Sequence, residues 1–165
     1  MQVVIALGSN LGESSNTLAQ ATKTIEQLEQ VRLLKQAPLY RTKPWGYADQ
    51  PDFVNSAILV DTSLELHELY RKLAQIELDF GRKRLFKNGP RTLDLDIIWA
   101  QDTKLNDDQL TIPHPRAQER AFVLVPLSDL DPELKFPDTG LTVAQALSQL
   151  PPSELAGVTP LTNQQ

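Results

Sequence analysis

The sequence predicts an α+β fold with a ferredoxin-like core, an α/β sandwich in which helices pack on a mostly antiparallel sheet. Short apolar runs and longer amphipathic stretches follow one another in the order β-α-β-β-α-β, which is typical of a split βαβ unit. The chain has 165 residues, 41% of them hydrophobic, enough for one domain with its own core. It contains no cysteine, so thiolate chemistry is excluded and any metal must be held by oxygen or imidazole.

The first half of the chain supplies two strands around a helix and then a third strand. Val3–Leu7 is a short apolar run that ends at a glycine, as a buried strand often does. Apolar spacing predicts a helix over Ser15–Gln30, with a stripe formed by Leu18, Ala21, Ile25 and Leu28. Val31–Tyr40 is expected to be a strand with an irregular end, because prolines close it, and Phe53–Val60 is the next strand.

The clearest helix lies between that strand and a basic loop. Thr62-x-x-Glu65 has the form of a capping box at its start, and Gly81 is the expected stop. Its apolar face comprises Leu66, Leu69, Leu73, Ile76 and Phe80. His67 lies off this face and is expected to be exposed. A strand over Leu93–Ala100 completes the sheet, and both core helices are expected on one of its faces.

The C-terminal part is punctuated by prolines and predicts only short helices, over Ala121–Leu130 and Thr142–Leu150. We expect a single domain over residues 1–150. The last residues, 151–165, are polar and contain proline, so we expect them to form a loose tail.

Charge and hydropathy narrow the classes of function. A formal net charge of -5 and a pI near 5.0 argue against binding to a long polyanion such as DNA. The N-terminus lacks the basic segment and long apolar run of a signal peptide or membrane span. We therefore expect a cytoplasmic monomer that acts on small molecules and binds neither nucleic acid nor membrane.

One loop departs from this acidic background. Positive side chains crowd the segment 82–91, which has no acidic residue, and they are Arg82, Lys83, Arg84, Lys87 and Arg91. Like charges this close repel one another, so an anion bound among them would stabilise the arrangement. A solvated basic loop without a ligand is the alternative.

Asp94 and Asp96 follow this loop directly, and residues two apart on a strand share a face. Paired carboxylates suit Mg²⁺, which completes its shell with water and substrate phosphates, although an acidic edge strand with no ligand is the alternative. Because paired acids adjoin a basic loop, the segment favours phosphoryl transfer, whose catalysis is mostly positioning and charge stabilisation. The sequence has neither a P-loop nor a dinucleotide-binding glycine pattern.

A proline-rich loop carries a different candidate site. Trp45 precedes a strand that bears Phe53 and Asn55, and rings beside an amide suit a flat heteroaromatic ligand. Ordinary core packing of both rings is the alternative. His114 lies between two prolines and near Arg120, a setting that suits contact with phosphate.

These segments together resemble the signature of the 6-hydroxymethyl-7,8-dihydropterin pyrophosphokinase family. The most specific block is Gly89-Pro90-Arg91-Thr92-Leu93-Asp94-Leu95-Asp96-Ile97-Ile98. Further blocks match in the same order: Gly8-Ser9-Asn10-Leu11, Tyr40-Arg41-Thr42, Asp49-Gln50-Pro51-Asp52-Phe53-Val54-Asn55, Ile76-Glu77 with Gly81-Arg82, Ile112-Pro113-His114, and Arg120-Ala121-Phe122. The resemblance covers Val3 to Pro137 and implies a ferredoxin-like enzyme that transfers pyrophosphate from ATP to the hydroxymethyl oxygen of the dihydropterin and releases AMP.

The resemblance also implies roles for individual residues. Asp94 and Asp96 would bind two Mg²⁺ on ATP, and Asp96 would help take the hydroxyl proton. Arg82 and Arg91 would clamp the phosphates during catalysis. The other nucleotide contacts would come from Glu77, Arg84, Ile97, Thr111, His114 and Arg120. The pterin would contact Thr42, Pro44, Trp45, Phe53, Asn55 and Phe122, with the two phenylalanines on either side of its ring.

The sequence departs from the family pattern in the loops. Family members often have Trp before the Gly-Pro-Arg and Tyr after the His, where this chain has Asn88 and Pro115. Trp45 stands where Leu is common, and we hypothesise that it supplies the stacking surface that Asn88 lacks. Two alternatives remain: a family member that binds both substrates but turns over poorly, and an RNA-recognition module, which the acidity and the lack of an RNP-like block oppose.

Overall fold

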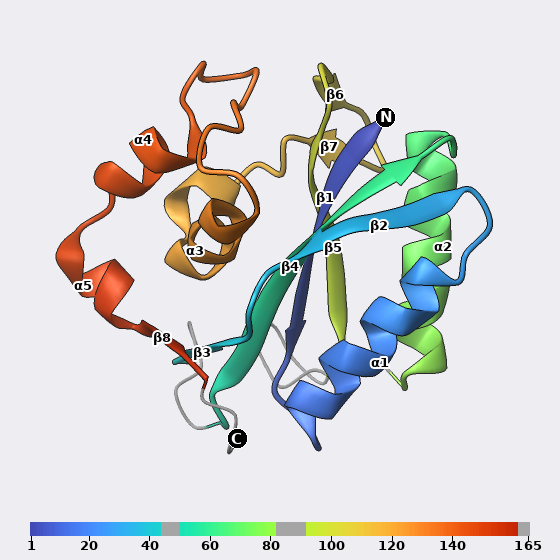
Figure 1. Cartoon of the computed structure of the whole chain (residues 1–165), viewed down its shortest axis with the longest axis horizontal. Helices are drawn as coiled ribbons and strands as arrows, with labels where there is room; N and C mark the ends of the chain where they lie inside the picture. The colour runs from blue at the N-terminus through green and yellow to red at the C-terminus, as the bar shows by residue number, and fades with distance from the viewer. Residues whose placement is uncertain (44–49, 82–91, 162–165) are drawn as a thin grey trace.

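The computed structural model describes residues 1–43, 50–81 and 92–161, and its elements follow the predicted order (Figure 1). The first seven are β1 (Gln2–Ser9), α1 (Ser14–Glu26), β2 (Val31–Gln36), β3 (Tyr40–Thr42), β4 (Phe53–Thr62), α2 (Leu66–Asp79) and β5 (Asp94–Ala100). The C-terminal part adds β6 (Leu105–Asn106), β7 (Thr111–Ile112), a 3-10 helix η1 (Ala117–Glu119), α3 (Ala121–Leu130), α4 (Val143–Ser148), α5 (Pro152–Ala156) and β8 (Val158–Pro160). The α+β class is confirmed.

The main sheet is antiparallel in every pairing of the described strands. Its order is β5-β1-β4-β3-β8, and β2 also pairs with β4, while β6 and β7 form a separate hairpin. Strand β4 is long enough to pair with β3 through its first residues and with β2 through its last. The register places Gly8 of β1 between Asn55 of β4 and Asp94 of β5, so residues distant in sequence share one row.

Alternation along the strands divides the core into two layers. On one face, Val3, Ile5 and Leu7 of β1 pack with the apolar stripes of α1 and α2, as the sequence predicts. On the other face, Val4 packs with α3 and α4. Figure 1 shows the two helical layers on opposite sides of the sheet. The C-terminal third of the chain therefore covers the face that the two core helices leave open.

The two core helices begin and end differently from the predictions. Helix α1 stops at Glu26, because the chain turns through Gln30, whose φ of 68° lies in the left-handed region. The predicted capping box of α2 is wrong: Glu65 is the N-cap, and its carboxylate accepts a hydrogen bond from the His67 N–H. Thr62 belongs to β4, where its hydroxyl donates to the Gln30 carbonyl at 2.7 Å. Gly81 ends α2 with a φ of 75°, as expected.

Residues 151–161 contain a helix and a strand, unlike the predicted loose tail. Residues Pro152–Ala156 form α5, and β8 pairs with β3 in antiparallel register, with Thr159 opposite Arg41. The Leu161 N–H also donates to the Leu39 carbonyl at 3.1 Å. A strand this short gains its stability from its partner rather than from its own sequence, so its pattern did not reveal it. No helix in the described part of the chain combines the length and apolar character that crossing a membrane requires.

Candidate active site

Three of the predicted site residues, Asn55, Asp94 and Asp96, lie near the end of β1, where β4 and β5 begin. Asp94, Gly8 and Asn55 lie side by side on β5, β1 and β4, and Asp96 lies opposite Ala6 in the next row. Residues two apart share a face, so these side chains lie on the face that packs against α3 further along the sheet. The sheet thus brings the proposed metal residues and the proposed pterin residue to one face.

Gly8 allows Asn55 to occupy its position. A Cβ added at Gly8 would lie 2.9 Å from Asn55 Nδ2, closer than real Cβ atoms approach a neighbour. Glycine therefore leaves room for this close side-chain approach.

Asn10 is a positioning residue that the sequence interpretation missed. Its side chain is 2% exposed, and Nδ2 donates to Gln50 Oε1 at 2.7 Å and to the Pro51 carbonyl at 3.0 Å. It ties the loop after β1 to the segment that leads into β4. The available signal was a polar residue in the turn between the first apolar run and the following helix. A buried Asn at such a position must find hydrogen-bond partners.

Two buried polar atoms on β3 and β4 have no hydrogen-bond partner within the described residues. Asn55 and Thr42 are each 8% exposed, yet within the described residues Asn55 Oδ1 and Thr42 Oγ1 have no hydrogen-bond partner. Buried polar atoms are normally satisfied, and each orphan carries a free-energy penalty. Thr42 lies opposite Phe53, which is half-buried, so an acceptor, a hydroxyl and a ring occupy neighbouring positions. This combination fits a flat ligand with donor groups along one edge.

Asp94 and Asp96 have the arrangement that the sequence predicts. They alternate with Leu95 and Ile97, whose side chains are buried in the core, so both carboxylates lie on the opposite face. Asp94 is half-buried and Asp96 is exposed. In the described ranges no cluster of three or more acidic or histidine side chains could hold a metal by itself. A pair of carboxylates fits Mg²⁺ whose remaining positions are taken by phosphate and water.

His114 lies close to Asp96 and to two arginines. Burial is the main cause that lowers the pKa of His114; Asp96 opposes this shift, while Arg120 and Arg116 add to it. The Arg116 N–H donates to His114 Nδ1 at 3.3 Å, so in the neutral ring the proton is on Nε2. The Arg120 guanidinium lies 5.5 Å from the centre of the Phe122 ring. His114 thus brings a donor group near Asp96, and Arg120 lies close to His114.

Three further nucleotide candidates within the described residues lie on α2, β5 and β7. Glu77 of α2 accepts a hydrogen bond from the Leu95 N–H at 2.7 Å, which joins α2 to the outermost strand. The Thr111 hydroxyl donates to Asn106 Oδ1 at 3.1 Å. The Ile97 side chain is 4% exposed and packs in the core, so Ile97 can contact a ligand mainly through its backbone.

Several predicted residues lie outside the described residues. They are Pro44, Trp45, Arg82, Arg84, Asn88 and Arg91. Their roles, including the proposed compensation of Asn88 by Trp45, stay predictions.

Comparisons with known proteins agree with the geometry. Residues 4–132 match the family model of 7,8-dihydro-6-hydroxymethylpterin-pyrophosphokinase. A 2-amino-4-hydroxy-6-hydroxymethyldihydropteridine pyrophosphokinase of Pseudomonas aeruginosa is 46% identical over 137 residues, covering 83% of this chain and 85% of the relative. The enzyme of that name from Methylorubrum extorquens is 38% identical over 154 residues, 93% of this chain and 96% of the relative.

A solved structure resembles the fold. The wild-type HPPK-DHPS of Plasmodium falciparum with pteroate matches with a TM-score of 0.67 at 15% identity, over 90% of this chain and 42% of that chain. This chain therefore spans less than half of that larger protein, and the likeness concerns the fold alone. Because the family model and the two close relatives span most of the sequence, the chain belongs to the 7,8-dihydro-6-hydroxymethylpterin-pyrophosphokinase family.

Proposed function

We propose that the sheet face beside Gly8 is where this chain, an ATP-dependent pyrophosphokinase of folate synthesis, carries out its reaction. The pyrophosphoryl group of ATP passes to the hydroxymethyl oxygen of 6-hydroxymethyl-7,8-dihydropterin, and AMP leaves. The observation that carries this proposal is the row Asp94–Gly8–Asn55, because it joins a candidate metal residue and a candidate pterin residue across three adjacent strands.

Asp94 and Asp96 would hold two Mg²⁺ together with the triphosphate. When bound, Mg²⁺ neutralises phosphate charge and aligns the phosphorus with the attacking oxygen. The carboxylates share one face of β5, and this strand is fixed by β1 on one side and by Glu77 through the Leu95 N–H. Asp96, the more exposed of the two, is also the group that we propose takes the proton of the substrate hydroxyl.

Asn55 and Thr42 would hold the edge of the pterin. Their buried oxygens have no partner within the described residues, so donors of the pterin would satisfy them. Phe53 and Phe122 would lie on either side of the ring, with Pro44 and Trp45 completing this end of the pocket. The separation of pterin groups on β3 and β4 from carboxylates on β5 lets both substrates bind at once.

The phosphates would contact His114 and Arg120 along with three arginines of the basic loop, Arg82, Arg84 and Arg91. His114 is suited to this contact as a neutral donor, because burial lowers its pKa and its Nδ1 is already an acceptor. Glu77, Thr111 and the Ile97 backbone would border the adenosine. We propose that Arg82 and Arg91 stabilise the charge that develops as AMP departs.

The decisive experiment incubates the purified chain with ATP, Mg²⁺ and the hydroxymethyl dihydropterin and follows AMP and diphosphorylated pterin. We expect both products in equal amounts, and a severe loss of turnover in Asp94→Ala and Asp96→Ala. Asp108→Asn is the matched control, since Asp108 is an exposed aspartate outside the site. Wild-type turnover in either alanine variant would contradict the metal assignment, and binding of both substrates without product would indicate a catalytically degenerate member.

A further inference from the structure

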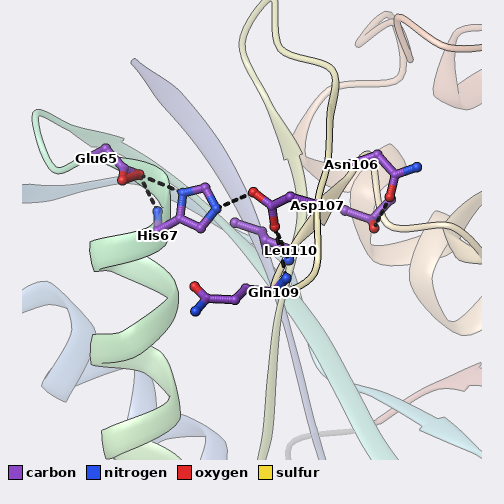
Figure 2. A network of polar contacts seen from close by, with 7 residues as sticks. Glu65, His67, Asn106, Asp107, Gln109 and Leu110 are labelled. Atoms are coloured by element: carbon purple, nitrogen blue, oxygen red, sulfur yellow. Dashed lines mark hydrogen bonds and ion pairs between the residues drawn. The ribbon is translucent and has the colours of Figure 1, made fainter.

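His67 is embedded in a polar network that the proposed reaction does not use. It lies in the first turn of α2, and its side chain is 24% exposed, so it is half-buried where the sequence predicts an exposed histidine. Its Nδ1 lies 3.1 Å from Glu65 Oε2, and its Nε2 lies 2.6 Å from Asp107 Oδ2 (Figure 2). The ring therefore bridges two carboxylates that come from different elements.

Two carboxylate contacts require an imidazolium. A neutral imidazole has one donor nitrogen and one acceptor nitrogen, whereas ionised carboxylates only accept. Both contacts can therefore be hydrogen bonds only when both ring nitrogens carry protons. The charges around the ring agree with this state: hydrogen bonds to Asp107 and then to Glu65 raise the pKa of His67. The pKa of Glu65 is lowered chiefly by a hydrogen bond from the His67 backbone N–H. The pKa of Asp107 is lowered chiefly by a hydrogen bond from the Gln109 backbone N–H.

Asp107 connects this bridge to the β6–β7 hairpin. Its Oδ1 accepts from the Gln109 and Leu110 N–H groups, both at 2.9 Å, and so closes the turn between the two strands. Its Oδ2 is the atom that meets His67. One carboxylate thus holds the turn and fastens it to α2, as Figure 2 shows.

The hairpin leads directly to nucleotide candidates. Thr111 of β7 lies opposite Asn106, the residue before Asp107. After β7, the His114 N–H donates to the Ile98 carbonyl of β5 at 2.9 Å. The hairpin is therefore fixed to β5 beyond its C-terminal strand and to α2 at its turn.

We propose that His67 is a positioning residue, whose imidazolium ties the β6–β7 hairpin to α2 and so holds Thr111 in place for the nucleotide. The part of this inference that concerns the nucleotide rests on the proposed function; the tie itself does not. Glu65 and Asp107 are the two charged groups that act on the ring, while Arg71, one turn along α2, acts on Glu65. Loss of the ring proton removes one donor and frees the hairpin turn.

The direction of the pH effect follows from these charges. The pKa of His67 is raised in the folded protein, so its contribution is fully present below its ordinary pKa and is lost as pH rises through the folded value. The pKa values of Glu65 and Asp107 are lowered, so their contributions are lost only on strong acidification, as pH falls through those values. The tie is therefore fully formed below the ordinary histidine pKa and is lost as pH rises through the raised pKa of folded His67.

The first measurement follows the ring protons of His67 by NMR during a pH titration, with His67→Gln to distinguish its signals from those of His114. We expect His67 to titrate above the ordinary histidine pKa in the unmodified chain. In Asp107→Asn its pKa should be lower than in the unmodified chain. That variant keeps an oxygen for the turn N–H groups but removes the charge. Asp108→Asn, on the same turn, is the matched control and should leave the titration unchanged. A titration at or below the ordinary value in the unmodified chain would overturn the proposal.

The second measurement compares hydrogen-exchange protection of the hairpin amides and affinity for a nonhydrolysable ATP analogue with Mg²⁺. We expect both to fall about two- to fivefold above the His67 transition, the size of an exposed ion pair. In His67→Gln both should be low at every pH. Equal hairpin protection in His67→Gln and the unmodified chain would overturn the tie, and equal analogue affinity would overturn the positioning role. A chain that binds no analogue at any pH would instead contradict the proposed function.

Discussion

Gly8 and Asn55 lie opposite each other across the β1–β4 pair. A Cβ added at Gly8 would lie only 2.9 Å from Asn55 Nδ2. We therefore expect Gly8→Ala to displace the Asn55 amide and weaken pterin binding. Overpacking costs about 1–3 kcal/mol, so the free energy of unfolding should fall as well. Pterin affinity and urea denaturation measure the two effects.

Gly157→Ala is the matched control for that substitution. Its added Cβ would lie 3.6 Å from the Glu154 carbonyl oxygen, an ordinary contact, and its φ is -78°. This variant should keep pterin affinity and stability near their original values. Unchanged pterin affinity in Gly8→Ala would mean that Asn55 does not contact the pterin or that its amide moves without cost.

Removing the Glu77 carboxylate should destabilise the sheet. Glu77 accepts from the Leu95 N–H at 2.7 Å, and loss of one such hydrogen bond costs about 1 kcal/mol, with a further penalty where the donor stays buried. We expect Glu77→Ala to lower the unfolding midpoint in urea. Glu77→Gln retains an oxygen acceptor and should lose less. If both variants unfold like the original chain, solvent satisfies the Leu95 N–H.

Tyr40 should ionise at a higher pH than an unperturbed tyrosine. Burial, with help from its hydrogen bond to Asp129, raises the pKa of Tyr40 to about 12. Because the folded pKa lies above the usual value of 10.0, the Tyr40 contribution to stability is present below about pH 10 and is lost as pH rises through about 12. Ultraviolet absorbance of tyrosinate should show a late step that Tyr40→Phe removes. A step that persists in this variant would assign it to another tyrosine.

Arg82 should contribute mainly to the rate. We expect Arg82 to stabilise charge that develops during the transfer. Arg82→Ala should therefore lower turnover by about 10²–10³, the effect of removing one preorganised hydrogen-bond donor. Steady-state kinetics with ATP varied separate turnover from affinity. A change confined to the Michaelis constant for ATP would make Arg82 a ground-state contact instead. Arg32→Ala, a substitution of an exposed arginine that pairs with Asp61 far from the site, is the control.

Much of the fold could be predicted because its periodicities are local. The stripes of α1 and α2 and the alternation of Asp94 with Leu95 depend only on spacing, and the structure places these residues as spacing requires. The start of α2 could not be read so directly: Thr62 and Glu65 have capping-box spacing, but β4 continues through Thr62. The pairing of β4 therefore decided where α2 begins, and the local capping-box motif did not.

The sequence indicated which residues form the candidate site, but not which residues hold them in place. Alternation predicted that Asp94 and Asp96 share a face, and the family resemblance indicated Asn55. The need for glycine at position 8 depends on the register between β1 and β4, which no local pattern contains. The partners of Asn10 lie 40 residues away or more, so its role also required the folded chain. The spacing of residues in one sequence does not reveal such long-range contacts between strands and loops.

The pairing of β8 with β3 has a consequence for shortened forms of the chain. A protein that stopped at the end of α4 would lack β8, and the outer N–H and C=O groups of β3 would be open to solvent. Such unpaired backbone is a template for a strand of another molecule. Self-association would then occur through the strand that bears Thr42, so we expect truncation to obstruct the proposed pterin end of the site as well as to lower solubility.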